Sequence, residues 1–190
     1  MNKVAIVGGS EDTRDLAPYN DLSCEIWSVA PRYMNYDYLK RVTRLFELHP
    51  RKGFDPFYLD FLRTINIPVY MQKVWSDFPT SVEFPIREIL ERDDWYINTF
   101  SMLISFAAYL RFDEVTLYGI EVEHDWEYQW DCLCYQARKA RKKGTAVVFF
   151  GIEKEETPPI YGYQYARCPN FRTLFVFPDD IKDVDLEGSI

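Results

Sequence analysis

The stretch that decides the fold is Thr99-Phe-Ser-Met-Leu-Ile-Ser-Phe-Ala-Ala-Tyr-Leu-Arg111, followed closely by Glu114-Val-Thr-Leu-Tyr118 and Gly119. Apolar and small residues cover most of the circumference of the first segment, which predicts a helix that is buried on most sides. The second segment is rich in residues that favour strands. A buried helix, a buried strand and a glycine together predict one unit of an open α/β sheet. In such sheets, ligands bind at the carboxyl ends of the strands.

The same alternation of strand and helix patterns runs through residues 3–150. Short apolar runs predict strands at residues 3–7, 24–30, 44–49, 68–71, 114–118 and 145–150. Helical patterns occupy residues 12–16, 36–42, 55–63, 86–92, 99–111 and 128–143, with Asp55 as an N-cap and Gly144 as a stop. Residues 73–85 show neither pattern. Strands that alternate with helices favour a mostly parallel sheet of five to six strands with both faces covered.

Composition and charge exclude several classes of protein. The chain is 47% hydrophobic and 17% aromatic, which is typical of a packed core and not of a disordered protein. Its net charge of -8 argues against binding along a nucleic-acid backbone. No stretch approaches the ~20 apolar residues of a membrane span. The first residues run directly into Val4-Ala-Ile-Val7 without the pattern of a signal peptide, so we expect a cytoplasmic protein.

The four cysteines predict free thiols, not a disulfide framework or a zinc site. Cys132 and Cys134 lie two residues apart in a predicted helix, so their side chains diverge by roughly 200° around its axis. That spacing suits neither a disulfide nor two zinc ligands on one helix face. We expect no zinc, flavin or haem.

The predicted strand ends bring several candidate ligand-binding residues to one edge of the sheet. Gly8, Gly9 and Ser10 follow the first strand, where backbone N–H groups at a helix start can bind an anion. The third glycine of the dinucleotide-binding fingerprint is missing, and a plain strand-to-helix turn would explain the segment equally well. Right-handed crossovers also bring both histidines of the chain, His49 and His124, to this edge.

An acidic segment after Gly119 carries the candidate catalytic residues. His124 is the candidate general base or acid, because imidazole titrates near neutrality and the flanking Glu123 and Asp125 favour its protonated form. Such a base suits the deprotonation of a hydroxyl group or a water molecule. Glu121 and Glu123 lie two apart and would face the same side of an extended chain, where they could share a Mg²⁺ ion. An exposed loop histidine and a solvated acidic loop are the alternatives.

The aromatic residues could stack on a base or a sugar ring. Aromatic side chains at this frequency are more often part of the core. We single out Tyr128 and Tyr163 as members of the site.

Several short motifs follow one another along residues 3 to 163: Val4-Ala-Ile-Val-Gly-Gly-Ser10, Glu25-Ile-Trp27, Leu45-Phe-Glu-Leu-His49, Ala107-Ala-Tyr-Leu110, Tyr118-Gly-Ile-Glu121, Glu127-Tyr128 and Pro158-Pro-Ile-Tyr-Gly-Tyr163. Their order resembles that of a group of uncharacterised tailed-phage proteins. More remotely, the layout is similar to bacterial sialyltransferases that use a cytidine-monophosphate sugar donor and to archaeal-type 6-hydroxymethylpterin diphosphokinases.

The change in the character of the sequence from Gly151 onwards predicts a C-terminal arm, residues 151–190, that packs on the core. The resemblances imply a Rossmann-like three-layer domain in residues 1–150. They also imply nucleotide contacts by the first loop, by Thr99 and Ser101 at the start of a helix, and by Gly119. The first loop departs from the pattern of the phage group, because Glu11 and Asp12 stand where that group more often carries small residues and proline. This departure argues against simple phosphate cradling by the loop.

The sequence therefore predicts a phage-encoded enzyme of the host cell cytoplasm that binds a nucleotide or nucleotide sugar. Its reaction would be glycosyl or phosphoryl transfer, or hydrolysis of a nucleotide derivative. Two alternatives stay open: a non-catalytic binder that sequesters a host nucleotide signal, and a Rossmann-like scaffold for protein interaction. The substrate, the presence of turnover and the oligomeric state, including a homo-oligomer, are left open by the sequence.

Overall fold

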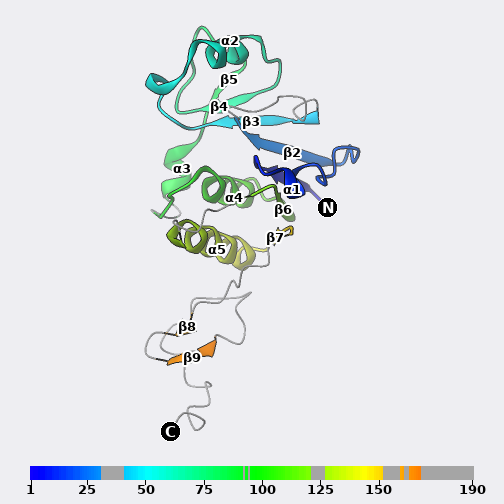
Figure 1. Cartoon of the computed structure of the whole chain (residues 1–190), viewed down its shortest axis with the longest axis vertical. Coiled ribbons are helices and arrows are strands. Elements are labelled where there is room, and N and C mark those ends of the chain that lie inside the picture. The colour runs from blue at the N-terminus through cyan, green and yellow to red at the C-terminus, as the bar shows by residue number, and fades with distance from the viewer. Residues whose placement is uncertain are drawn as a thin grey trace. The chain divides into compact units, whose positions relative to one another are not determined.

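The computed structural model describes residues 1–30, 41–91, 93, 95–120, 127–151, 159–160 and 163–167 (Figure 1). The chain divides into two compact units, Met1–Ile152 and Glu153–Ile190. In the second unit, β8 (Pro159–Ile160) and β9 (Tyr163–Arg167) form an antiparallel pair. The packing of the predicted C-terminal arm on the core stays a prediction.

The first unit contains a seven-stranded sheet in which every strand pair is parallel. The strand order is β5-β4-β3-β2-β1-β6-β7. The strands are β1 (Lys3–Val7), β2 (Cys24–Val29), β3 (Arg44–Glu47), β4 (Val69–Met71), β5 (Ser81–Glu83), β6 (Glu114–Tyr118) and β7 (Ala146–Phe149). The predicted parallel α/β architecture is therefore confirmed.

The prediction of five to six strands was too low by at least one. The missed strand is β5, which lies inside the segment expected to be irregular, residues 73–85. It has only three residues, at the edge of the sheet, and Val82 and Glu83 are exposed. A short edge strand needs no continuous apolar run, so no local pattern in residues 81–83 indicates a strand.

Five α-helices and one 3-10 turn are described in the first unit. They are α1 (Glu11–Arg14), η2 (Arg51–Gly53), α2 (Pro56–Thr64), α3 (Ile86–Leu90), α4 (Thr99–Tyr109) and α5 (Glu127–Lys142). Asp55 caps α2 as predicted, since its side chain accepts a hydrogen bond from the Tyr58 backbone N–H. Gly144, just after α5, has the positive φ of 93° that favours glycine at a helix end. The helix predicted at residues 36–42 falls mostly outside the described residues.

The helices form layers on both faces of the sheet. On one face, Tyr58 and Leu62 of α2 belong to the same buried cluster as Leu45 of β3. On the other face, Phe106 of α4 contacts Trp27 of β2, with ring centroids 5.3 Å apart. Helix α5 packs beside α4 in the same layer and contacts β7 (Figure 1). The central strands are therefore buried on both sides, which explains their nearly continuous apolar sequences.

The three described cysteines lie inside this core and form no disulfide bond. Cys24, Cys132 and Cys134 are all buried. Burial raises the pKa of the Cys24 and Cys132 thiols, so both are held in the unreactive protonated form. Cys168 lies outside the described residues.

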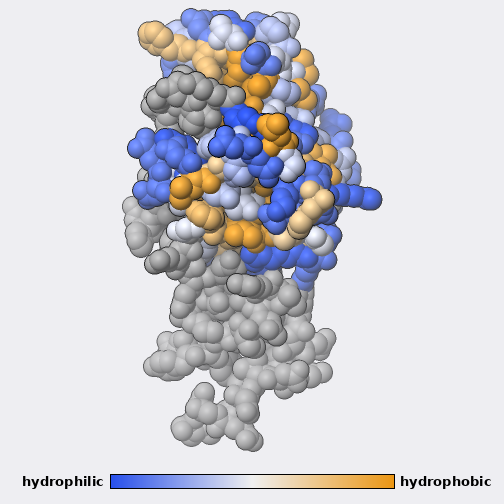
Figure 2. All heavy atoms as spheres, turned by 90° about the vertical axis from the view of Figure 1, so that its right-hand side faces the viewer, coloured by the Kyte–Doolittle hydropathy of each residue, from blue (hydrophilic) through white to orange (hydrophobic). Residues whose placement is uncertain are grey.

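Exposed apolar side chains are dispersed over the surface. The most exposed are Met1, Leu16, Leu22, Phe57 and Val74. On the face shown in Figure 2, hydrophobic residues form small groups with hydrophilic residues between them. Such dispersed apolar residues are normal for a protein surface, so this face does not indicate a docking surface. None of the described helices combines the length and apolarity needed to cross a membrane.

We expect Phe106 to be a principal contributor to stability. It is 3% exposed, and its ring also lies 5.2 Å from that of Phe84 and 6.1 Å from that of Phe46. Phe106→Ala should lower the free energy of unfolding by about 3–5 kcal/mol, because the cavity it leaves cannot collapse fully. Denaturant titration followed by circular dichroism would measure this loss.

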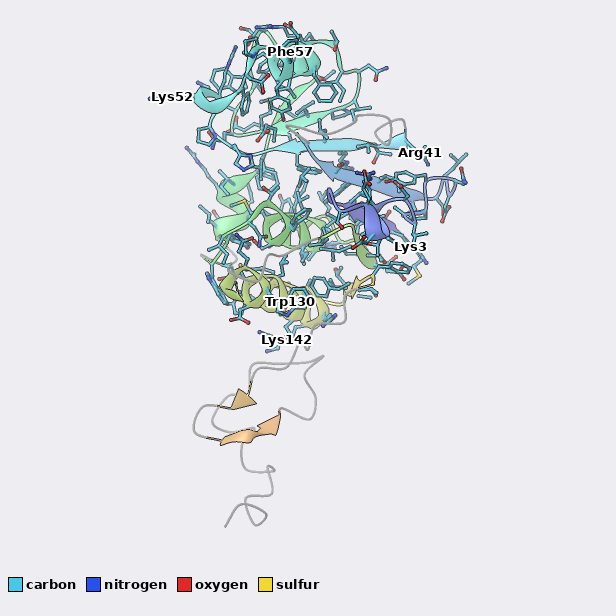
Figure 3. All side chains as sticks on the ribbon, viewed as in Figure 1. Lys3, Arg41, Lys52, Phe57, Trp130 and Lys142 are labelled. Atoms are coloured by element: carbon cyan, nitrogen blue, oxygen red, sulfur yellow. The ribbon has the colours of Figure 1, made fainter. Side chains whose placement is uncertain are left out.

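Phe57→Ala is the matched control. Phe57 lies on the outer side of α2 and is 87% exposed (Figure 3). Its removal should change stability by no more than about 0.5 kcal/mol. Equal losses in the two variants would contradict the assignment of Phe106 to the core.

Candidate functional site

The topological switch point of the sheet lies between β1 and β6. The chain leaves β1 towards β2 on one side and leaves β6 towards β7 on the other. In open α/β sheets this divergence usually creates a crevice for a ligand. Here two backbone hydrogen bonds tie the loops together: the Gly8 N–H donates to the Tyr118 carbonyl (2.8 Å) and the Ser10 N–H to the Gly119 carbonyl (3.0 Å).

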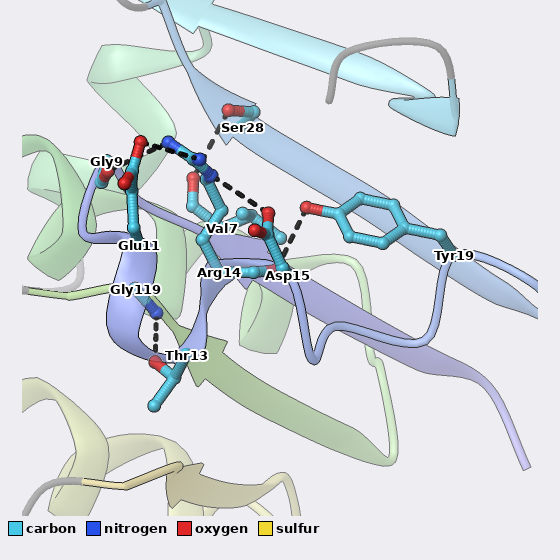
Figure 4. A network of polar contacts seen from close by, with 9 residues as sticks. All are labelled: Val7, Gly9, Glu11, Thr13, Arg14, Asp15, Tyr19, Ser28 and Gly119. Atoms are coloured by element: carbon cyan, nitrogen blue, oxygen red, sulfur yellow. Dashed lines mark hydrogen bonds and ion pairs between the residues drawn. The ribbon is translucent and has the colours of Figure 1, made fainter. Parts of the chain in front are cut away.

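Two glycines permit this close approach. A Cβ atom on Gly8 would lie 2.3 Å from the Gly119 carbonyl oxygen. Gly119 has a φ of +59°, and a Cβ there would lie 2.7 Å from the Ser10 carbonyl oxygen. Its own N–H donates to the Thr13 hydroxyl at 2.6 Å (Figure 4). The two loops therefore form one closed unit, and a phosphate could use the Gly8 and Ser10 amides only by displacing these bonds.

Arg14 provides a buried positive charge beneath the first loop (Figure 4). Its guanidinium donates to the Gly9 carbonyl (3.1 Å), to Asp15 (3.2 Å) and to Glu11 (3.3 Å). Burial acts to lower the pKa of Arg14, but the hydrogen bonds and attraction of Asp15 and then Glu11 outweigh it, so the pKa is raised. Glu11, one of the two unexpected acidic residues of this loop, is thus a partner of Arg14.

A cavity of about 510 Å³ lies at the neighbouring carboxyl ends of β2 and β3. Its volume falls within the range of roughly 300–1,000 Å³ that is usual for small-molecule sites. The strand side is lined by Val29, Ala30, Phe46, Leu48 and His49. The helix side is lined by residues 96–100, Met102 and Gln129.

The N-terminus of α4 forms one wall of this cavity. The Asn98 side chain accepts a hydrogen bond from the Ser101 N–H (2.8 Å), and the Ser101 hydroxyl donates to the Asn98 carbonyl (2.7 Å). This reciprocal cap fixes where the helix begins. The first turn of a helix presents N–H groups without intrahelical partners and carries the positive end of the helix dipole. Thr99 and Phe100, which belong to this turn, line the cavity.

A chain of hydrogen bonds reaches the cavity from the end of β3. The Glu47 side chain is only 1% exposed, whereas that of His49 is 61% exposed. One carboxylate oxygen of Glu47 lies 2.6 Å from Nδ1 of His49 and also accepts the His49 backbone N–H at 2.9 Å. The other oxygen accepts the hydroxyl of Tyr58 at 2.5 Å.

The residues singled out from the sequence fall into three groups. His49 and Thr99 line the cavity, and Ser101 is fully buried and caps α4. The second group lies at the switch point and is absent from the cavity wall: Gly8, Gly9, Ser10 and Gly119. The third group is not described: Glu121, Glu123 and His124 lie outside the described residues, as do the side chains of Tyr128 in α5 and Tyr163 in β9.

No metal centre is identified in the described part of the chain, which contains no group of three or more metal-binding side chains. The predicted Mg²⁺ ligands, Glu121 and Glu123, are not among those residues, so this metal site stays a prediction. Sequence reasoning missed Arg14, Glu47 and Tyr58. For Glu47 a signal existed, because a carboxylate inside a buried strand requires hydrogen-bonding partners.

Comparison with known proteins finds one solved structure that is similar to this chain. No protein-family model matches the chain, and no curated protein matches it. Among solved structures, the sialyltransferase CstII from Campylobacter jejuni, in complex with the substrate analogue cytidine-5'-monophosphate, is similar. The alignment covers 93% of this chain and 89% of that chain, with 14% identity and a TM-score of 0.49. A similarity of this degree carries no assignment of residues or activity.

The contact between Gly8 and Gly119 predicts a local effect of a single methyl group. Gly8→Ala should lower the free energy of unfolding by about 1–3 kcal/mol, because the backbone must move to accept the Cβ atom. It should also speed hydrogen exchange at the Ser10 amide, whose partner is the Gly119 carbonyl. Both effects can be measured, by denaturant titration and by NMR.

Gly144→Ala is the control for this prediction. Gly144 has a positive φ, but a Cβ there would have no atom within 4 Å. This variant carries only conformational strain of about 1–2 kcal/mol and should leave exchange at Ser10 unchanged. Unaltered exchange at Ser10 in Gly8→Ala would show that the two loops are not held together by this contact.

Proposed function

We propose that the protein binds a nucleotide or a nucleotide-linked small molecule in the cavity at the ends of β2 and β3. The observation that carries this proposal is the meeting of a cavity of about 510 Å³ with the N-terminus of α4. We further propose that the bound compound is a donor whose linked group is transferred or hydrolysed. A non-catalytic binder would use the same cavity and would release its ligand unchanged.

The charge of the cavity wall supports an anionic ligand. Although the net charge of the chain is -8, none of the described residues in the wall is acidic. The helix N-terminus adds a positive potential there, and its free N–H groups suit phosphate oxygens. An anion that would be repelled by most of the surface can therefore be accepted in this cavity.

The remaining wall suits the base or sugar of such a ligand. Val29, Phe46 and Met102 provide apolar surface, while Asn98 and Gln129 provide polar groups. A few polar groups on a mainly apolar wall are usual for small-molecule sites, because the polar groups orient the ligand.

Other elements of the proposal come from the sequence alone. They are ligand contacts by Gly8, Gly9, Ser10, Gly119, Tyr128 and Tyr163, a Mg²⁺ ion on Glu121 and Glu123, and a catalytic role for His124. The phage origin of the protein and its place in the host cytoplasm likewise stay predictions.

Thermal-shift screening tests the ligand class. Nucleoside mono-, di- and triphosphates and nucleotide sugars would be added to the full chain, with and without Mg²⁺. At least one should raise the melting temperature, since a ligand at 100 times its Kd stabilises the native state by about 2.7 kcal/mol. No shift with any of these compounds at millimolar concentration would contradict the proposal.

Two variants locate the binding. Ala30→Phe adds a ring to the cavity wall and should abolish the shift. Leu22→Phe introduces the same side chain at a position that is 85% exposed and outside the cavity wall, and should preserve the shift. A ligand that still binds Ala30→Phe with unchanged affinity would occupy another site.

A further inference from the structure

We propose that His49 is a proton acceptor in this cavity and that the second substrate is a compound with a hydroxyl group, or water. Buried Glu47 and Tyr58 act as positioning residues for the imidazole. The inference rests on the proposed function for the identity of the donor. The arrangement of His49, Glu47 and Tyr58 does not depend on which donor binds.

Glu47 is held in place by complete hydrogen bonding. A buried carboxylate is costly unless its oxygens accept hydrogen bonds. Glu47 meets this requirement with three donors: the hydroxyl of Tyr58 and the backbone N–H and Nδ1 of His49. Tyr58 is itself 1% exposed, and its ring packs edge-on against Phe54 at 5.1 Å. The acceptor beside His49 is therefore fixed by the core.

The hydrogen bonds to Glu47 favour one tautomer of His49. The Glu47 oxygen beside Nδ1 already accepts the His49 backbone N–H, and we assign Nδ1 as a second donor to the same oxygen. In a neutral imidazole the other nitrogen, Nε2, then has a free lone pair. Nε2 makes no hydrogen bond within the described residues, and His49 lines the cavity. The bare nitrogen is thus available to a ligand.

The backbone restricts the same imidazole further. The oxygen of Glu47 that binds Nδ1 also binds the His49 backbone N–H, so ring and backbone share one anchor. Pro50 follows directly and biases His49 towards an extended conformation. A base held by a buried acid, which is held by a third group, is the arrangement that serves general-base catalysis.

A role in stability alone explains this arrangement less well. A buried charged group contributes little to stability compared with an apolar residue of the same size. The pair is also asymmetric, because Glu47 is buried and the imidazole is largely exposed in the cavity. This asymmetry leaves the ring accessible to a ligand.

Nε2 of His49 takes the proton of a hydroxyl group or water while that oxygen bonds to the carbon or phosphorus atom being transferred. The bond from this atom to the nucleotide phosphate oxygen breaks, and its electron pair leaves with the nucleotide, which the N-terminus of α4 stabilises. Glu47 stabilises the imidazolium, and the proton later passes to solvent.

NMR of the ¹⁵N-labelled full chain tests the positioning without any ligand. The chain has only two histidines, so His49→Asn and His124→Ala assign the ring signals. At a pH where the rings are neutral, His49 should be in the Nδ1–H tautomer. Glu47→Leu should shift the population towards the Nε2–H tautomer. An Nε2–H tautomer in the unmodified protein would overturn the proposal, whether or not Glu47→Leu folds.

Nucleotide release from a donor that binds in the screen tests the proton transfer. His49→Asn should lower kcat by roughly 10²–10⁴-fold while the donor Kd changes little. Tyr58→Phe, which keeps the ring and removes the hydroxyl, should lower kcat by a smaller factor.

The outcomes separate this proposal from the proposed function. If donors bind but His49→Asn turns over normally, or only His124→Ala is inactive, His49 is not the proton acceptor. Bound donors that are never turned over would also overturn its catalytic role. If no donor binds, the proposed function fails, and the tautomer of His49 alone supports or overturns the arrangement.

Discussion

The parallel pairing of β1 with β6 is the interaction on which the rest of the structure depends. It aligns Lys3 with Glu114 and Val7 with Tyr118, residues 111 positions apart in sequence. Without it, β1 to β5 would form one sheet and β6 and β7 another. Strands β1 and β6 would then each be an unpaired edge strand. The glycines at its carboxyl end follow from the same constraint, because the pairing brings the two loops closer than any side chain allows. The strand order, the register and the closed switch point therefore all follow from the pairing of β1 with β6.

Much of the fold could be predicted because buried parallel strands and helices leave strong local patterns. The helix from Thr99 and the strand from Glu114 were clear, since apolar residues cover most of one and fill the other. Asp55 and Gly144 were recognisable because helix ends impose chemical requirements on single residues. The exposed edge strand β5 was missed, because what defines it is hydrogen bonding to β4, and nothing within its own three residues shows that partner.

The candidate site was only partly predictable for a related reason. His49 and Thr99 were found because strand ends and helix starts can be located in a sequence. Tyr58 was missed since it reaches Glu47 from the next helix, through a contact that no local pattern encodes. For the first loop the sequence left a phosphate cradle and a plain strand-to-helix turn open, and the structure shows two of its amides bonded to the neighbouring loop. Sequence patterns thus located the edge of the sheet that carries the site. They did not predict which side chains and amides hydrogen-bond to one another there.

The strand order also has a consequence for synthesis. Because a protein is synthesised from its N-terminus, β1 to β5 leave the ribosome before β6. Until β6 has emerged, the edge of β1 that pairs with β6 stays unpaired. The cavity is divided in the same way: Ala30 and His49 belong to the early half, and Thr99 and Gln129 to the late half. In a nascent chain, the strand side of the cavity is therefore synthesised before the helix side. A ligand of this cavity therefore stabilises only completed molecules and takes no part in nucleating the first half of the sheet.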